Sequence, residues 1–284
     1  MEQSKQQGGQ PGTAQAAHSA IGTDFAAAVG PVSEHTIIRT DSDGLLAGEV
    51  SVMAGDRAIP VYRARPEGKS NLPVVLVVSE IFGVHAHIAD VARRFAKLGY
   101  LALAPALFVR QGDPMSFASV AELVQQLISA VPDAQVISDL DACVAWAGMH
   151  GGDTGKLAVT GFCWGGRITW LYCAHNPAVN AGVAWYGKLI GKRTELSPLS
   201  ALDIAADLKV PVLGLYGGKD EAIPVDTVEE MKAALAKGGN RSEFVIYPDA
   251  GHAFHADYRP AYAEADAKDS WLRCLDWLCQ HGVV

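Results

Sequence analysis

The sequence lacks the features that would place this protein in a membrane or on nucleic acid. No stretch approaches the ~20 consecutive apolar residues that a membrane-spanning helix needs, and the longest apolar runs, such as 74–78, have the length of a strand. No block of lysine and arginine occurs, and the formal net charge is −8. These absences argue against nucleic acid and against a membrane as partners.

Cysteine is scarce, and its spacing matches neither a zinc site nor a disulfide framework. The number of cysteines in the 284 residues is odd, at five, which favours reduced thiols and a cytoplasmic compartment. Four of them lie in apolar helical patterns and are predicted to be buried core residues: Cys143, Cys173, Cys274 and Cys279. Only Cys163 has unusual neighbours.

The first thirty residues are rich in glutamine, glycine and alanine. They contain no basic stretch followed by a long apolar core, so a secretory signal is not indicated. We predict a poorly ordered extension over residues 1–30, followed by a single domain over 31–284.

Strand and helix patterns alternate from about residue 47 onwards. The first two strand patterns, 48–55 and 57–66, predict an antiparallel pair joined at Gly55 and Asp56. Later units of strand and helix with short connections predict an α/β fold, in which a mainly parallel twisted sheet carries helices on both faces. The later strand patterns are 73–80, 100–107, 156–160, 180–187, 209–217 and 242–249. Ligands of such sheets bind beyond the carboxyl ends of the strands.

The segment GFCWGG (161–166) follows one of these strands and enters a helix. Glycines two residues before and two after Cys163 fit a tight turn that raises a nucleophile above the sheet. The amide groups at the start of the helix favour a thiolate and later an oxyanion. The alternative is an inert buried thiol.

Two further side chains follow the last two strand patterns. Asp220 lies beyond the strand at 209–217, and His252 lies beyond the strand at 242–249. The order nucleophile, acid, histidine is that of α/β-hydrolases, in which His252 would transfer protons and Asp220 would orient the imidazole. Asp220 could instead form a turn, and His252 could cap one.

The segment SEIFG (79–83) follows the first buried strand. In this position we expect a second oxyanion donor, so the backbone N–H groups of Ile81 and Trp164 are the candidates. Glu80 is harder to explain, because an acid beside an active thiol disfavours the thiolate.

Four segments together resemble the dienelactone hydrolase (carboxymethylenebutenolidase) family, the cysteine branch of the α/β-hydrolases. They are SEIFGVHAH, GFCWGG, YGGKDEAIP and PDAGHAFHADYRP, in this order. The resemblance implies a triad of Cys163, Asp220 and His252, and it implies that Glu80 interacts with the thiol and helps to activate it when substrate binds. It further implies a lactone or small ester as substrate and no metal or organic cofactor.

The sequence departs from the family in one respect. Members that open dienelactone are described as holding the substrate carboxylate with two arginines. Here no arginine occurs between Arg110 and Arg167, and Ala256 follows GHAFH. Arg259 lies seven residues beyond His252 and is not an obvious substitute, so a carboxylate on the substrate is not predicted.

Three side chains are candidates for lining the pocket: His85, Tyr186 and His255. A structural role is at least as plausible for each of them. His85 and His87 are two residues apart, so on a helix they would not share a metal ion.

The sequence therefore predicts a hydrolase that cleaves a small ester or lactone through an acyl-enzyme on Cys163. One alternative is a non-hydrolytic protein on the same fold that binds a small molecule or senses redox state through this thiol. Another is an acyltransferase. The sequence leaves the physiological substrate and the oligomeric state open.

Overall fold

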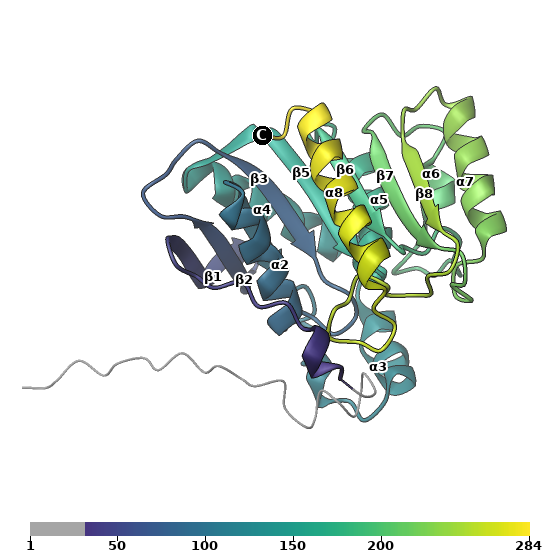
Figure 1. Cartoon of the computed structure of the whole chain (residues 1–284), viewed down its shortest axis with the longest axis horizontal. Helices are drawn as coiled ribbons and strands as arrows, with labels where there is room; N and C mark the ends of the chain where they lie inside the picture. Colours follow the sequence, from purple (N-terminus) through teal and green to yellow (C-terminus); the bar gives the residue numbers. More distant parts are fainter. Residues whose placement is uncertain (1–31) are drawn as a thin grey trace, which may run out of the picture.

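The computed structural model describes residues 32–284 and arranges them around one eight-stranded sheet (Figure 1). The strand order is β1-β2-β4-β3-β5-β6-β7-β8. The hairpin of β1 (Leu45–Ala54) and β2 (Arg57–Pro66) is antiparallel, as is the pairing of β2 with β4, whereas all later neighbours are parallel. The other strands are β3 (Leu72–Val78), β4 (Leu101–Pro105), β5 (Gly152–Phe162), β6 (Ala181–Trp185), β7 (Val212–Gly217) and β8 (Glu243–Tyr247). The predicted, mainly parallel sheet is confirmed.

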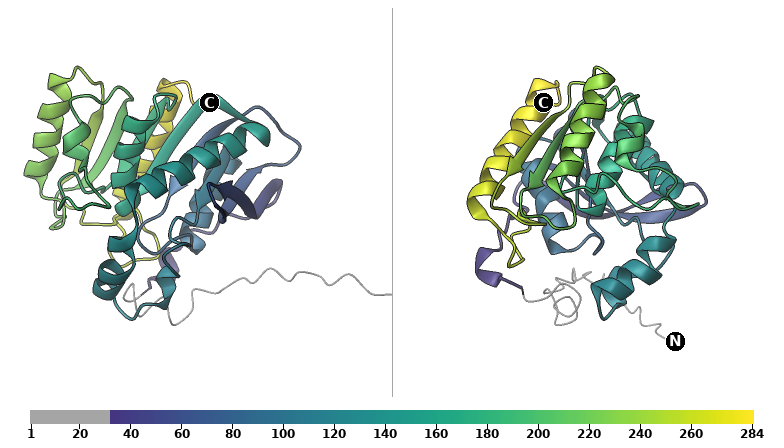
Figure 2. Two further views of the ribbon diagram at one scale, coloured as in Figure 1. Left: turned by 180° about the vertical axis from the view of Figure 1, so that it is seen from behind. Right: turned by 90° about the vertical axis from the view of Figure 1, so that its right-hand side faces the viewer.

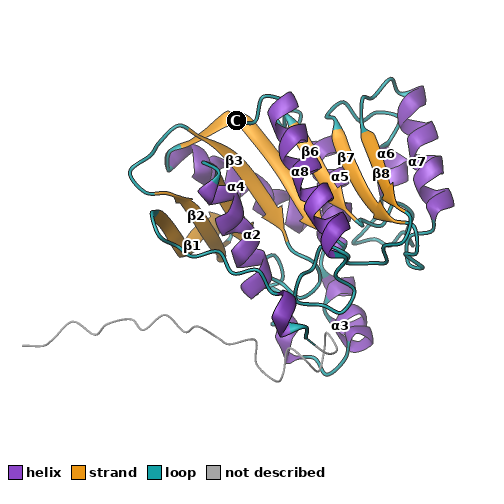
Figure 3. Cartoon of the chain, viewed as in Figure 1, coloured by secondary structure: helices purple, strands orange, loops and turns teal. Residues whose placement is uncertain are grey.

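Helices cover both faces of this sheet (Figures 1 and 2). One face carries α2 (Ala86–Lys97) and α8 (Glu264–Gln280), and the other carries α4 (Asp133–Met149), α5 (Trp164–His175) and α7 (Val225–Lys237). The short α3 (Val120–Gln126) lies away from the sheet, beyond one end of it (Figure 3). The remaining helical turns are η1 (Glu34–Thr36), η2 (Pro114–Ser116), η3 (Ile128–Ala130) and α6 (Ala201–Ile204).

The apolar runs of the sequence became the central strands. Every residue of β4, β6 and β7 is buried, which is expected of parallel strands covered by helices on both faces. The turn between β1 and β2 contains Gly55 at a φ of 64°, a conformation that glycine adopts without steric strain.

The stretch 188–207 contains the short helix α6, because Ser200 and Asp203 form a capping box that starts a helical turn. One prediction about the cysteines differs from the structure. Cys279 is exposed, so its predicted burial is wrong. The buried stripe of α8 includes Cys274 and Leu278, and Cys279 lies just beyond it.

The other cysteine predictions agree with the structure. All five cysteines are free, and Cys143, Cys173 and Cys274 are buried. Within residues 32–284, no helix has the length and apolar character needed to cross a membrane. The extension predicted over residues 1–30 lies outside the described residues.

Candidate active site

Cys163 occupies a sharp turn between β5 and α5. Its backbone has φ 54° and ψ −111°, a conformation that residues with a Cβ rarely adopt and that is found at functional turns. Its N–H donates a hydrogen bond of 2.9 Å to the carbonyl oxygen of Trp185 on the neighbouring strand. The turn thereby holds the thiol at the carboxyl edge of the sheet, where it is partly exposed.

The flanking glycines allow the backbone segments around this turn to approach one another. A Cβ on Gly161 would lie 2.2 Å from the carbonyl oxygen of Gly165, and a Cβ on Gly165 would lie 2.3 Å from that of Val78. Neither position has room for a side chain. The glycine spacing of the motif is therefore a packing requirement of the turn.

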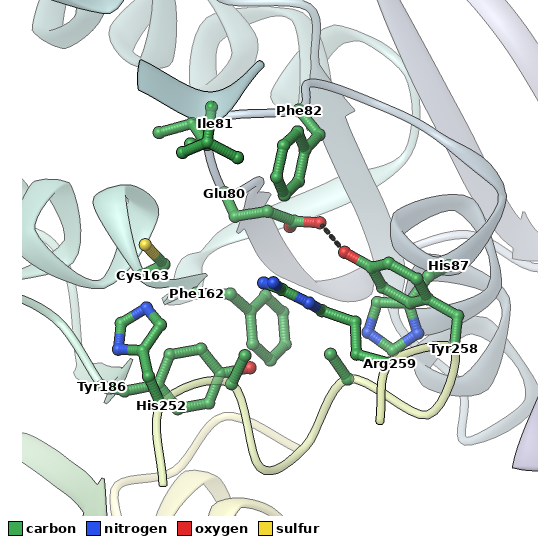
Figure 4. Close-up of a pocket in the computed structure, with 13 residues that line it drawn as sticks. Glu80, Ile81, Phe82, His87, Phe162, Cys163, Tyr186, His252, Tyr258 and Arg259 are labelled. Atoms are coloured by element: carbon green, nitrogen blue, oxygen red, sulfur yellow. Dashed lines mark hydrogen bonds between the residues drawn. The ribbon is translucent and has the colours of Figure 1, made fainter. Parts of the chain in front are cut away.

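His252 and Asp220 reach the same edge of the sheet from the loops after β8 and β7. The imidazole Nδ1 lies 2.7 Å from Oδ2 of Asp220, whose side chain is wholly buried. Burial opposes the charge on His252, but hydrogen bonding to Asp220 and to Cys163 outweighs it and raises the pKa of the imidazole to about 10. Figure 4 shows the imidazole next to the sulfur. The structure thus brings together the three residues predicted as a triad.

A cavity of about 230 Å³ opens in front of the thiol. Its walls are mainly apolar and include Phe82, Val120, Phe162 and Tyr186. The cavity suits a small organic molecule whose reacting group meets the sulfur.

Glu80 lines the same cavity but binds other groups than the thiol. The Tyr258 hydroxyl donates to its Oε1 at 2.9 Å, and Nε2 of His85 contacts the same oxygen. Burial alone would raise the pKa of Glu80, but the nearby His85 and His87 lower it to about 2, so the carboxyl is ionised. Among the described residues, Glu80 forms no hydrogen bond with Cys163, although the sequence led us to expect a contact between them.

The two candidate oxyanion donors flank the thiol. Trp164 is the first residue of α5, and Ile81 lines the cavity from the loop after β3. Within the described part of the chain, neither backbone N–H donates to a protein acceptor. Both therefore remain available to a substrate oxygen.

Of the three residues predicted to line the pocket, one lines the cavity and two do not. Tyr186 lines the cavity, with its ring centroid 5.2 Å from that of His252. His85 does not line it, because this residue caps α2 and its Nδ1 accepts from the His87 N–H while Nε2 contacts Glu80. His255 faces a second cavity of about 340 Å³, because its ring is stacked between Phe162 and Trp271.

Two cavity residues lie outside the three pocket candidates. His87 lines the cavity, and its Nδ1 lies 3.0 Å from Oδ1 of Asp257. No local pattern links these two residues, which are 170 positions apart.

Arg259 is the second cavity residue outside the three pocket candidates. Successive turns, closed by hydrogen bonds of 2.9 Å from Ala256 N–H to Ala253 and from Arg259 N–H to Ala256, return it to the cavity. Its guanidinium lies 5.9 Å from the ring centroid of Phe82 and forms no ion pair within residues 32–284.

No group of three side chains suited to a metal ion occurs among those residues.

Comparison with known proteins identifies a family for this chain. The model of the dienelactone hydrolase family matches residues 59–282. A Methylorubrum extorquens protein named "Putative carboxymethylenebutenolidase" is 57% identical over 267 residues, which are 94% of this chain and 92% of that protein. An Escherichia coli protein of the same name is 52% identical over 259 residues, covering 91% of this chain and 95% of the other.

A solved structure agrees with these relatives. The crystal structure of a "Putative Dienelactone Hydrolase" from Klebsiella pneumoniae superimposes with a TM-score of 0.82 at 55% identity, covering 83% of this chain and 99% of that one. The chain is therefore an α/β-hydrolase that acts on carboxylic esters or lactones. It belongs to the dienelactone hydrolase family.

Proposed function

We propose that the protein hydrolyses a small ester or lactone through a covalent acyl-enzyme on Cys163, with His252 and Asp220 as the proton-transfer pair. The observation that carries this proposal is the position of the His252 imidazole between the Asp220 carboxylate and the Cys163 thiol. A pKa of about 10 keeps this imidazole protonated at neutral pH. A positive charge beside the sulfur is what a thiolate nucleophile requires.

The reaction follows from the positions of these groups. The Cys163 sulfur attacks the carbonyl carbon, and the oxyanion accepts hydrogen bonds from the N–H groups of Ile81 and Trp164. His252 gives its proton to the departing alkoxide oxygen and then takes one from water, which attacks the thioester and releases the acid. One oxyanion donor is typically worth ~3 kcal/mol of transition-state stabilisation.

The guanidinium of Arg259 supports a substrate that carries an anionic group. Arg259 faces the cavity without an ion-pair partner among the described residues, and its neighbour Phe82 is apolar. A guanidinium in such surroundings binds a carboxylate with two parallel hydrogen bonds. Arg259 therefore binds the anionic group of the proposed substrate, although its position in the sequence differs from those of the two arginines described for the family.

The test is a comparison of the wild type with Cys163→Ala on p-nitrophenyl acetate and on a series of lactones. The variant should fold and lose turnover, and the wild type should show a mass increase of one acetyl group on Cys163 in a quenched reaction. Cys279→Ala is the matched control, because this thiol is exposed and lies on α8. Full turnover by the Cys163 variant would refute the proposal. Transfer of the acyl group to an acceptor other than water would identify an acyltransferase.

A further inference from the structure

Two polar side chains of the active-site cavity share an unusual arrangement. Each has one polar atom anchored by the protein and another that is buried and has no hydrogen-bond partner among residues 32–284. In Glu80, Oε1 is held by Tyr258 and His85, whereas Oε2 has no partner. In His87, Nδ1 is held by Asp257, whereas Nε2 has no partner.

Asp257 fixes the protonation and the orientation of His87. Its carboxylate is 1% exposed and also accepts a hydrogen bond of 2.5 Å from Arg94. Burial would raise the pKa of Asp257, but interactions with His87 and Arg94 lower it to about 2. The ionised carboxylate can only accept, so the proton of His87 stays on Nδ1 and the free position of the ring is Nε2.

Ring contacts hold the imidazole in place. The centroid of His87 lies 5.2 Å from that of Tyr258 and 6.2 Å from that of Phe162, both of which line the cavity. Figure 4 shows His87 beside Tyr258, near the side chain of Arg259. The nearest other imidazole, His255, lies 5.9 Å away in a T-shaped arrangement.

Leaving such buried atoms without hydrogen-bond partners costs free energy. A ligand that supplies the missing hydrogen bonds recovers this energy, and a ligand without them does not. The free oxygen of Glu80 can only accept, so the ligand must donate to it. A carboxylate or carbonyl oxygen would be repelled there, and an amine cation would be disfavoured by Arg259 in the same cavity.

We infer that Glu80 and His87 form a subsite for a hydroxyl group of the substrate, with Asp257 as the residue that positions His87. A hydroxyl can donate its proton to either of the two free atoms. The inference rests on the proposed function, which places the ester or lactone in this cavity.

The experiment compares γ-butyrolactone with α-hydroxy-γ-butyrolactone, which differ by one hydroxyl. The readout is the ratio of kcat/KM for the hydroxylated lactone to that for the plain lactone. His87→Asn keeps an N–H for Asp257 but lacks the unpartnered Nε2, so the ratio should fall about tenfold. His87→Gln places an amide near the position of Nε2 and should restore part of the ratio. A residue that only supports the fold would lower both activities together and leave the ratio unchanged.

His175→Asn is the matched control, because His175 forms an exposed pair with Asp141 at 2.8 Å, far from the cavity residues in the chain. Its ratio should equal that of the wild type. A folded His87→Asn enzyme with the wild-type ratio would overturn the inference.

A measurement on the wild type alone covers the case in which the variants do not fold. Both lactones are used as competitors of p-nitrophenyl acetate hydrolysis, and the hydroxylated one should inhibit about tenfold more strongly. Equal inhibition constants would overturn the subsite. The proposed function fails by a different result, namely lactone hydrolysis by Cys163→Ala, whatever the ratio is.

Discussion

Two histidine–aspartate pairs face one cavity, and they differ in what surrounds them. His252 and Asp220 are 2.7 Å apart, and the imidazole also meets the Cys163 sulfur. His87 and Asp257 are 3.0 Å apart, and this aspartate is shared with Arg94. In the proposed mechanism, the first pair transfers protons because Cys163 is adjacent. The second pair, whose aspartate also binds Arg94, is proposed instead to hold a hydrogen-bonding group in a fixed position.

The exposure of the two imidazoles matches this division. The side chain of His252 is 30% exposed, whereas that of His87 is 4% exposed. A group that exchanges protons with water needs such access. A group that recognises a substrate atom gains from being dry, because its hydrogen bonds are then stronger.

Removing the acid of the first pair should have the largest effect. We expect Asp220→Asn to lower kcat by about 10³–10⁴-fold, because the amide cannot stabilise the protonated imidazole and favours the wrong tautomer. Steady-state kinetics on p-nitrophenyl acetate measure this. Asp141→Asn, which alters the exposed pair with His175, should retain full activity. A loss of less than tenfold in Asp220→Asn would mean that His252 works without its carboxylate.

Removing the acid of the second pair should act on stability instead. Asp257→Asn leaves the buried His87 without its anionic partner and leaves Arg94 with Asp90 alone. Breaking a buried pair in this way typically costs about 3–5 kcal/mol. The free energy of unfolding in urea measures this loss. Asp141→Asn should change it by less than about 1 kcal/mol, because exposed pairs contribute little. An unchanged free energy of unfolding in Asp257→Asn would show that the network carries no net stability.

The first pair should also make stability depend on pH. The pKa of His252 rises from 6.5 to about 10 on folding, so its charged form stabilises the folded state. This contribution is complete below pH 6.5 and is lost as pH rises through 10. The free energy of unfolding of the wild type should therefore fall towards that of His252→Gln over this interval. A difference between the two proteins that grows with pH would contradict the assignment.

The smallest expected effect concerns Arg259. We expect Arg259→Gln to lower kcat/KM for the p-nitrophenyl monoester of glutaric acid about tenfold relative to p-nitrophenyl valerate, which has the same chain length but no charge. Arg273→Gln is the control, because Arg273 pairs with Asp269 on the surface of α8. If Arg259→Gln lowered kcat/KM equally for both esters, the proposal that the substrate carries an anionic group would be wrong.

The sequence predicted those parts of the fold and of the site that are determined by residues adjacent in the chain. The apolar runs at 73–80 and 209–217 are long enough to predict buried strands by themselves. β7 lies within the second run, and β3 begins one residue before the first. The glycines around Cys163 predicted the turn, because that backbone geometry tolerates no side chain two residues away from the thiol.

The unpredicted parts depend on how distant segments meet. Arg259 returns to the cavity through two short turns, which spacing along the chain does not reveal. The pairing of His87 with Asp257 joins the first turn of α2 to the segment after β8. The carboxylate of Glu80 is bound by Tyr258, which the same segment brings close. Long-range contacts of this kind leave no periodic pattern in the sequence.

The wall that α3 contributes to the cavity has a further consequence. Val120, the first residue of this short helix, lines the cavity although α3 belongs to no layer of the sheet (Figure 1). The segment that limits the size of the bound molecule is thus separate from the segments that hold the sulfur and the imidazoles. Changes in α3 can enlarge or narrow the range of accepted molecules while the bond-breaking groups keep their places.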